Sequence, residues 1–344
     1  MALLPTPLLP SRSSVPSPLV TQLLHLSTSQ LAALPYPPDV FPGARDVQTS
    51  FGDMRVYEFG DETGRKVMLV HGDATSAPLW RQVAEGLVEM GCRVIVLDLW
   101  GRGYSSSPNA IHDGRLFGLQ LLFAASSSPL PWCSEGFSIV GFSLGGGIAM
   151  DFVASFPHLV QSVALLAPVG LLRDLPASYQ RLQQAARERH DEAELKNLLA
   201  SILGVEQSHN NPAAEEPQSD HPEKSAAVDS DAIQRWQFLH HEGHAASFIS
   251  SLLHGPIQHQ HEMWREASRV LREKRRSQEG KEMLVVIRGS EDGVVSSAHL
   301  QEDLDAIVGR GEYVFEEVPG GHEFLLDKAA SEEVVGILRR EWNL

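Results

Sequence analysis

The chain has 344 residues, of which 42% are hydrophobic and 21% are charged, a composition typical of globular proteins. Its formal net charge of −16 at pH 7 would repel a phosphate backbone, which argues against nucleic-acid binding. Two cysteines, Cys92 and Cys133, are too few for a disulfide scaffold and favour a reducing compartment. No apolar run reaches the roughly 18 residues that a membrane-spanning helix needs, so we expect no membrane span.

The first 44 residues form an N-terminal extension that is rich in Pro, Ser and Leu. Arg12 is its only Lys or Arg, and no acidic residue precedes Asp39. A secretory signal would carry positive charge ahead of its apolar stretch, which this segment lacks. We therefore predict an extension that packs on the core and a cytoplasmic location. An organellar transit peptide is the alternative, because acidic residues are scarce there.

The next segments indicate strands that alternate with helices. Residues 47–50 and 54–59 flank a turn and predict an antiparallel hairpin. Further strands are predicted at Val67–Val70, Arg93–Asp98, Phe137–Val140, Val163–Leu166, Met283–Ile287 and Tyr313–Val318. Because these strands are almost continuously apolar and helices intervene, we expect a mostly parallel sheet with helices on both faces. The predicted core comprises residues 45–172 and 281–344.

The alternation stops in residues 173–280, which we predict to form an inserted helical lid. Both ends of this stretch are helix-like, over Tyr179–Leu203 and Asp231–Arg276. Residues 208–230 between them are polar, acidic and proline-containing, which predicts a disordered loop. Since ligands bind at the carboxyl ends of parallel strands, we expect the lid to lie over that edge of the sheet.

The sequence Gly141-Phe142-Ser143-Leu144-Gly145 stands between a predicted strand and a predicted helix. This G-x-S-x-G pattern is typical of a nucleophile elbow, a tight turn that exposes a serine hydroxyl beyond the sheet edge. Glycines on either side allow the strand and the helix to approach closely. The alternative is a structural glycine turn that only happens to contain a serine. The flanking strand and helix favour Ser143 as a nucleophile.

A serine hydroxyl needs a base to accept its proton and an acid to orient that base. Asp292 follows the strand at 283–287, and His322 follows the strand at 313–318, each in a glycine-containing turn. Both side chains are therefore expected at the same edge of the sheet as Ser143. Glu291 is a competing candidate for the acid.

Taken together, these motifs resemble the α/β-hydrolase superfamily, in its lidded branch of esterases, thioesterases, lactonases and carbon–carbon bond hydrolases. The resemblance covers about residues 45–344 and also includes His71-Gly72 after a strand and the motif at Asp98–Ser105. It implies the α/β-hydrolase fold with an inserted helical lid. The order Ser, Asp, His along the chain matches this fold.

The resemblance also implies a role for each candidate residue. Ser143 would be the nucleophile, His322 the general base and then acid, and Asp292, three positions after a glycine, the acid that orients His322. The oxyanion hole would consist of the backbone N–H groups of Leu144 and Asp73. His71 would be structural, and the Gly101–Ser105 turn would be scaffold.

Asp73 departs from the family pattern, in which this position commonly carries an apolar or amide residue. A carboxylate beside a developing oxyanion is unfavourable, so its orientation matters. One interpretation is that Asp73 turns outward and accepts hydrogen bonds from the region of Thr75 and Ser76. The other is that it lines the pocket and favours a cationic or hydroxyl-bearing substrate.

The lid is rich in histidine, which raises the question of a metal site. Its histidines are His240, His241, His244, His254, His259 and His261. However, only one residue separates Glu242 from His244, so the segment is not an H-E-x-x-H motif. The sequence therefore predicts no metal and no cofactor.

The expected function is a serine hydrolase that cleaves an ester-like bond of a small, mostly apolar molecule through an acyl-enzyme. A dehalogenase or an epoxide hydrolase is disfavoured, because those relatives use an aspartate nucleophile and position 143 is serine. Alternatives are a carbon–carbon bond hydrolase or an acyltransferase on the same triad, and a ligand receptor with the hydrolase fold. The expected partner is a small-molecule substrate. The sequence specifies neither its identity nor the oligomeric state, because fold does not determine substrate.

Overall fold

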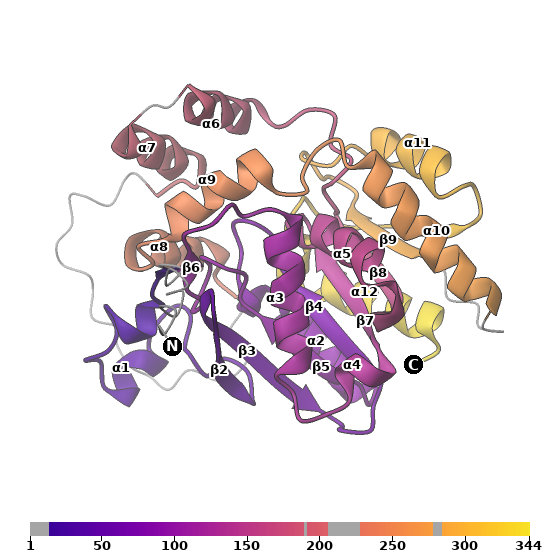
Figure 1. Cartoon of the computed structure of the whole chain (residues 1–344), viewed down its shortest axis with the longest axis horizontal. Coiled ribbons are helices and arrows are strands. Elements are labelled where there is room, and N and C mark those ends of the chain that lie inside the picture. Colours follow the sequence, from indigo (N-terminus) through magenta and orange to yellow (C-terminus); the bar gives the residue numbers. More distant parts are fainter. Residues whose placement is uncertain (1–13, 189–190, 206–227, 278–283) are drawn as a thin grey trace, which may run out of the picture.

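The computed structural model describes residues 14–188, 191–205, 228–277 and 284–344. Within them, eight strands form one sheet in the order β10-β9-β8-β7-β4-β5-β3-β2 (Figure 1). The strands are β2 (Ala44–Thr49), β3 (Gly52–Gly60), β4 (Lys66–Val70), β5 (Arg93–Leu97), β7 (Phe137–Phe142), β8 (Val160–Leu166), β9 (Leu284–Gly289) and β10 (Tyr313–Val318). Neighbours from β5 to β10 are parallel, whereas β3 pairs antiparallel with β5 and β2. The predicted mostly parallel sheet and the α/β-hydrolase fold are therefore confirmed.

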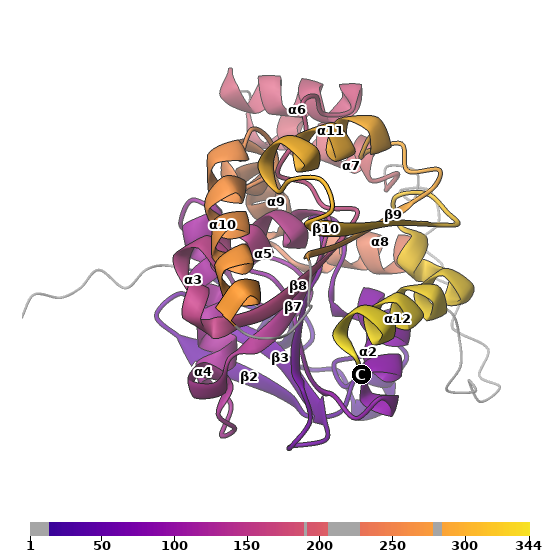
Figure 2. The ribbon, with the colours of Figure 1, turned by 90° about the vertical axis from the view of Figure 1, so that its right-hand side faces the viewer.

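Helices cover both faces of the sheet because successive strand residues point to opposite sides. In β4, Met68 and Val70 pack in the core with α3 (Gly114–Ser126), α5 (Leu144–Ser155) and α10 (His261–Ser277). Val67 and Leu69 pack on the other side with α2 (Arg81–Glu89) and α12 (Lys328–Trp342). Figure 2 shows the sheet between these two helical layers. Buried apolar side chains on both faces hold the strand ends, and thus the site, in a fixed frame.

Four helices lie over the carboxyl ends of the strands (Figure 1). They are α6 (Ala177–Arg187), α7 (Glu192–Ile202), α8 (Ser230–His240) and α9 (His244–His254). Helix α10, which we had included in the predicted lid, instead packs along α5 and α11 (Ser297–Ile307). The lid boundary at residue 280 stays a prediction, because an amphipathic pattern does not reveal which layer a helix joins. Of the predicted disordered loop, residues 208–227 lie outside the described residues, as does Met283.

Short elements complete the described chain. They are β1 (Ser14–Val15), β6 (Ser107–Pro108), α1 (Thr28–Ala32), α4 (Trp132–Glu135), η1 (Pro18–Val20), η2 (Ala77–Trp80), η3 (Pro157–Leu159) and η5 (Phe324–Leu326). Strand β1 pairs antiparallel with β6, which ties the N-terminal segment to the loop that follows β5. None of the helices in the described ranges is both long and apolar enough to cross a bilayer.

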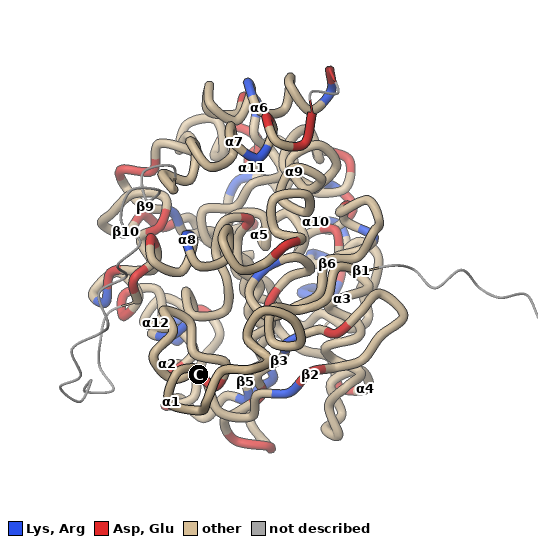
Figure 3. The backbone as a smooth tube through the Cα atoms, turned by 90° about the vertical axis from the view of Figure 1, so that its left-hand side faces the viewer, with Lys and Arg blue, Asp and Glu red and all other residues tan. Residues whose placement is uncertain are grey.

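The N-terminal segment reaches the core through the buried side chain of Tyr36. Its hydroxyl donates to Asp98 Oδ2 over 2.8 Å, and the same oxygen accepts from the Tyr104 N–H over 2.9 Å. Asp98 follows β5 and is fully buried, and this burial raises its pKa to about 6. The N-terminal segment is thus anchored to the turn that follows β5. Figure 3 shows acidic and basic residues scattered along the backbone rather than gathered in one patch.

Candidate active site

Ser143 occupies the sharp turn between β7 and α5. Its backbone angles are φ 52° and ψ −117°, in a region that residues with a Cβ rarely adopt. The turn is held by hydrogen bonds from the Ser143 N–H to Leu166 O over 2.9 Å and from the Gly146 N–H to Ser143 O over 2.9 Å. Strained backbone of this kind persists only where the surroundings enforce it, and it is common at functional sites.

The two glycines of the elbow are required by close approach rather than by their own backbone angles. A Cβ at Gly145 would lie 2.0 Å from Val70 O, and one at Gly141 would lie 2.3 Å from Gly145 O. Both distances are far inside van der Waals contact. The helix can therefore start directly behind the sheet only because neither position has a side chain.

We expect Gly145→Ala to lower the free energy of unfolding by about 3 kcal/mol, because the added methyl group must displace the β4 backbone. The matched control is Gly336→Ala in α12, where an added Cβ meets nothing within 4 Å. That exposed helical position should gain about 0.5–1 kcal/mol. Urea unfolding of the two variants measures both effects. Equal stabilities of Gly145→Ala and the unmodified chain would contradict the close-packing argument.

The structure brings Ser143, His322 and Asp292 together in one hydrogen-bonded row. His322 Nε2 lies 3.0 Å from Ser143 Oγ, and His322 Nδ1 lies 2.9 Å from Asp292 Oδ2. The competing candidate, Glu291, is exposed and takes no part in the row. Both nitrogens of the imidazole are thus engaged, one by a hydroxyl and the other by a carboxylate. This geometry permits proton transfer between Ser143 and His322.

The Asp292 carboxylate is fixed by its own loop. Its Oδ1 accepts from the N–H groups of Val294 and Val295 over 2.7 and 2.9 Å. Burial alone would raise the pKa of Asp292, but the hydrogen bond and charge of His322 and these two N–H groups hold it below its ordinary value. Asp292 is therefore ionised at neutral pH. Arg288 donates to Asp292 O and Val295 O and so supports the same loop.

The turn after β4 lies directly against the elbow. A Cβ at Gly72 would be only 3.1 Å from Ser143 Cβ, and the next residue, Asp73, lines the same pocket as Ser143. Leu144 is the first residue of α5, where backbone N–H groups have no intrahelical acceptor and the helix end is partially positive. Asp73 and Leu144 thus both line the pocket at Ser143, and the oxyanion hole that their N–H groups would form stays a prediction.

His71 supports this turn from behind. Its Nε2 accepts from the Leu99 N–H over 2.9 Å, and its Nδ1 donates to Gly72 O over 2.7 Å. Burial lowers its pKa to about 3, so the ring is neutral and both nitrogens are occupied. His71 thus ties the turn after β4 to the turn after β5.

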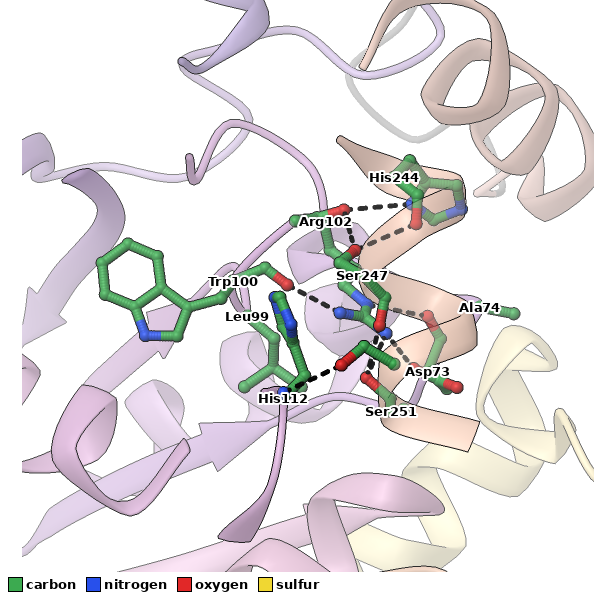
Figure 4. A network of polar contacts seen from close by, with 12 residues as sticks. Asp73, Ala74, Leu99, Trp100, Arg102, His112, His244, Ser247 and Ser251 are labelled. Carbon is green, nitrogen blue, oxygen red and sulfur yellow. Dashed lines mark hydrogen bonds and ion pairs between the residues drawn. The ribbon is translucent and has the colours of Figure 1, made fainter. Parts of the chain in front are cut away.

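The Asp73 side chain does not turn outward to Thr75 and Ser76, so that interpretation is wrong. Its carboxylate forms an ion pair with Arg102 (Figure 4). The Thr75 hydroxyl instead accepts from the Gly72 N–H over 3.0 Å. The Asp73 side chain retains 15% exposure, and it lines the pocket as the second interpretation expected. However, its charge is already matched by a guanidinium, which weakens the case for a cationic substrate.

A pocket of about 660 Å³, its open mouth included, leads to Ser143. Its wall is mostly apolar and comes from the core and from lid helices α6 and α9. The apolar lining residues are Ala74, Phe142, Leu144, Val169, Leu172, Leu175, Pro176, Phe248, Leu252, Ile257 and Val294. Polar groups in the lining are Asp73, Thr75, Tyr179 and Glu323, besides Ser143 and His322. A small molecule with an apolar body and one reactive polar bond fits this lining.

The buried lid histidines hold the lid rather than face the pocket. His241 Nε2 donates to Ser105 O over 2.7 Å, and His244 Nδ1 donates to Gly101 O over 3.1 Å. Burial lowers their pKa values to about 4 and about 3, so both are neutral. In the ranges that the structure describes, no group of three or more His, Cys, Asp or Glu side chains is arranged to hold a metal ion.

Sequence reasoning missed three residues of the site. Arg102 lies in the turn that the sequence predicts to be scaffold, although a lone cation between two glycines of a buried turn must find an anion. Tyr179 and Glu323 were not singled out. Glu323 follows the candidate base directly, and it accepts hydrogen bonds from Ser230 and Gln234 of α8 over 3.2 and 3.3 Å. It thereby links the base loop to the lid.

Comparisons with known proteins agree with this architecture. A sequence profile described as alpha/beta hydrolase fold matches residues 66–329. A serine hydrolase-like protein of Dictyostelium discoideum is 33% identical over 132 residues, which are 37% of this chain and 35% of that protein. A 2-hydroxy-6-oxo-2,4-heptadienoate hydrolase of Pseudomonas putida is 30% identical over 115 residues, 33% of this chain and 40% of the relative. The chain thus spans well under half the length of these curated relatives.

Solved structures are similar over a larger share of the chain. An esterase from a Rhodococcus species superimposes with a TM-score of 0.59 and 18% identity, and the match covers 87% of this chain and 98% of the esterase. At this identity the similarity concerns the fold alone.

Proposed function

The chain belongs to the α/β-hydrolase fold family, and from that premise we propose that it is a serine hydrolase of small, mostly apolar, neutral esters. The observation that carries the proposal is the row from Ser143 through His322 to Asp292, with separations of 3.0 and 2.9 Å. This row ends at the floor of an apolar pocket.

In the proposed reaction, Ser143 Oγ attacks the ester carbonyl carbon while its proton moves to His322 Nε2. The oxygen that becomes negative is received by the N–H groups of Leu144 and Asp73. His322 then gives the proton to the leaving alcohol, and an acyl-enzyme forms on Ser143. Water attacks this ester after losing a proton to His322, and the acid leaves as Ser143 regains its hydrogen.

Asp292 supports both halves of the cycle. By accepting from Nδ1 it keeps the Nε2 lone pair directed at Ser143, and its charge stabilises the imidazolium that forms twice per turnover. General-base assistance contributes on the order of 10²–10⁴ in rate, and an oxyanion donor contributes about 10²–10³.

The charges around the pocket favour neutral substrates over carboxylated ones. Among the described lining residues, Asp73 and Glu323 are acidic, and none is Lys or Arg. A substrate carboxylate would be desolvated there without a cationic partner, which is costly. A dienoate, the kind of substrate named for the Pseudomonas putida relative, carries such a group. This disfavours the carbon–carbon hydrolase alternative.

The decisive experiment combines covalent labelling with a matched pair of esters. A fluorophosphonate probe should modify the protein at Ser143, as located by peptide mass spectrometry. With p-nitrophenyl butyrate, kcat/KM should exceed that for p-nitrophenyl hemisuccinate, which adds a carboxylate at similar length, by about 10²-fold. Thioesters, lactones and a dienoate complete the panel.

Each outcome of this panel selects one hypothesis. Turnover limited to the dienoate would support carbon–carbon cleavage, and an added alcohol that outcompetes water would support acyl transfer. A single turnover without release would support a receptor. No adduct at Ser143 together with no turnover on any ester would overturn the proposal.

A further inference from the structure

Arg102 stands at the centre of a buried polar network behind the oxyanion turn (Figure 4). Its side chain is 0% exposed. It donates to Trp100 O over 2.6 Å, to Ser251 Oγ over 2.8 Å, to Asp73 O over 3.2 Å and to the Asp73 carboxylate. Two of these four acceptors belong to one residue, Asp73. A guanidinium fixed in this manner holds both the main chain and the side chain of its partner.

We propose that Arg102 is a positioning residue of this site, which neutralises Asp73 beside the developing oxyanion and fixes the peptide whose N–H receives it. The inference rests on the proposed acyl transfer at Ser143. It assigns a function to the turn Gly101–Gly103, which the sequence alone identified only as scaffold.

The charge argument starts from the place of Asp73. In the proposed mechanism the Asp73 N–H stabilises the negative charge of the oxyanion. The carboxylate of the same residue is itself negative and lies close to that charge. An uncompensated carboxylate there would oppose the negative charge that develops in the transition state. Arg102 supplies the opposite charge from the side away from the pocket, where substrate does not compete for it.

The geometric argument concerns the lid. Ser251 belongs to α9, the same helix that supplies Phe248 and Leu252 to the pocket wall. The Ser251 hydroxyl accepts from Arg102 and donates to Ser247 O over 2.9 Å. One guanidinium therefore connects the oxyanion turn with the helix that covers the substrate. A displacement of Arg102 would alter both at once.

The titratable groups around Asp73 and Arg102 determine which of them can change charge near neutral pH. Tyr179 of α6 faces Asp73, and the burial of Tyr179 together with the Asp73 charge raises the pKa of this tyrosine to about 12. His322 and Glu323 line the same pocket. Histidines beside Arg102 have pKa values lowered by burial to about 3 or about 4, and they are His71, His112, His241 and His244. None of these four histidines titrates near neutral pH.

Burial raises the pKa of Asp73, and the charge and hydrogen bonds of Arg102 oppose that rise. In Arg102→Gln the opposing contribution is lost, so the pKa of Asp73 rises further. Below that pKa the carboxyl group is neutral and tolerated. Above it the carboxylate is charged, unpaired and adverse to the oxyanion. The kcat of the variant should therefore fall as pH rises. The pH profile of the unmodified enzyme should lack this alkaline fall, because its Asp73 is paired.

The test measures kcat and KM for p-nitrophenyl butyrate as a function of pH. For Arg102→Gln, the ratio of unmodified to variant kcat should grow as pH rises, from below about 10 while Asp73 is protonated to about 10² once Asp73 is ionised. The double variant Arg102→Gln, Asp73→Asn should not show this pH-dependent growth, because asparagine at position 73 carries no charge at any pH. Arg102→Lys keeps the charge but cannot reach all four acceptors, so it should lower kcat about 10-fold at nearly constant KM and without the alkaline fall.

The matched control is Arg93→Gln, which removes another largely buried arginine from its pair with buried Glu58, at the opposite end of the sheet. It should lose stability without changing the pH profile. A pH profile for Arg102→Gln that parallels the unmodified one, or no rescue by Asp73→Asn, would overturn the inference while the hydrolase proposal stands. Should Arg102→Gln not fold, an unchanged kcat in Arg102→Lys would overturn it. No turnover by the unmodified enzyme would instead refute the proposed function.

Discussion

Replacing Ser143 by alanine is expected to lower kcat by about 10⁶, and replacing His322 in the same chain is expected to lower it little further. The reason lies in the 3.0 Å contact between Ser143 Oγ and His322 Nε2. Without the hydroxyl, the imidazole has no nucleophile to activate. Without the imidazole, the hydroxyl keeps its proton and remains a poor nucleophile. The two side chains therefore act as one unit, and their losses do not add.

The residual rate of each variant should be similar, because the pocket and the oxyanion N–H groups are left intact. This remainder is expected to be about 10³-fold above the uncatalysed hydrolysis. Single-turnover and steady-state kinetics on one ester, with active-site titration of the unmodified enzyme, measure the loss in kcat and the residual rate of each variant.

Two exposed residues of the same types provide the controls. Ser290 lies in the loop before Asp292, His254 is the last residue of α9, and both are exposed to solvent. The control variants are Ser290→Ala and His254→Ala. Neither change should alter kcat. If instead Ser143→Ala and His322→Ala each cost less than about 10-fold, or if their effects multiplied fully, the shared proton transfer would be wrong.

The sequence was sufficient for the sheet and for the candidate triad because both depend on local patterns. Apolar strands of four to six residues alternate with helices, and each candidate residue follows a strand in a glycine-containing turn. In a parallel sheet those turns share one edge, so three residues distant in the chain must meet there. Gly145 marks the position of Ser143 because nothing larger fits beside Val70.

What the sequence did not reveal depends on contacts between segments. The orientation of Asp73 is decided by Arg102, 29 positions later, and no periodic pattern links the two. Tyr36 reaches Asp98 across 62 positions in the same way. The packing of α10 on α5 is likewise not encoded in its own sequence pattern, since an apolar face can pack on a lid or on α5 equally well. In each case a local pattern shows that a side chain or a helix face must be buried. It does not show which distant segment that side chain or face will contact.

Asp292→Asn is expected to lower kcat by about 10⁴, whereas Glu291→Gln one position earlier should leave it unchanged. Asp292 Oδ1 already accepts from two backbone N–H groups, at 2.7 and 2.9 Å, so an asparagine would keep its carbonyl oxygen there. Its amide NH₂ would then face His322 Nδ1 and donate to it. That reverses the tautomer, because Nε2 must then carry the hydrogen and can no longer accept the proton of Ser143.

The pair of variants separates the tautomer from general electrostatics, because each removes one negative charge from the same loop. Only Asp292 touches the imidazole, at 2.9 Å, whereas the Glu291 side chain is exposed to solvent. Screening by water reduces the effect of the exposed charge to a small shift in the pH profile. Kinetics of both variants on one neutral ester measure the difference. Equal losses in the two variants would mean that net charge matters and orientation does not, and a loss confined to Glu291→Gln would assign the acid to the other carboxylate.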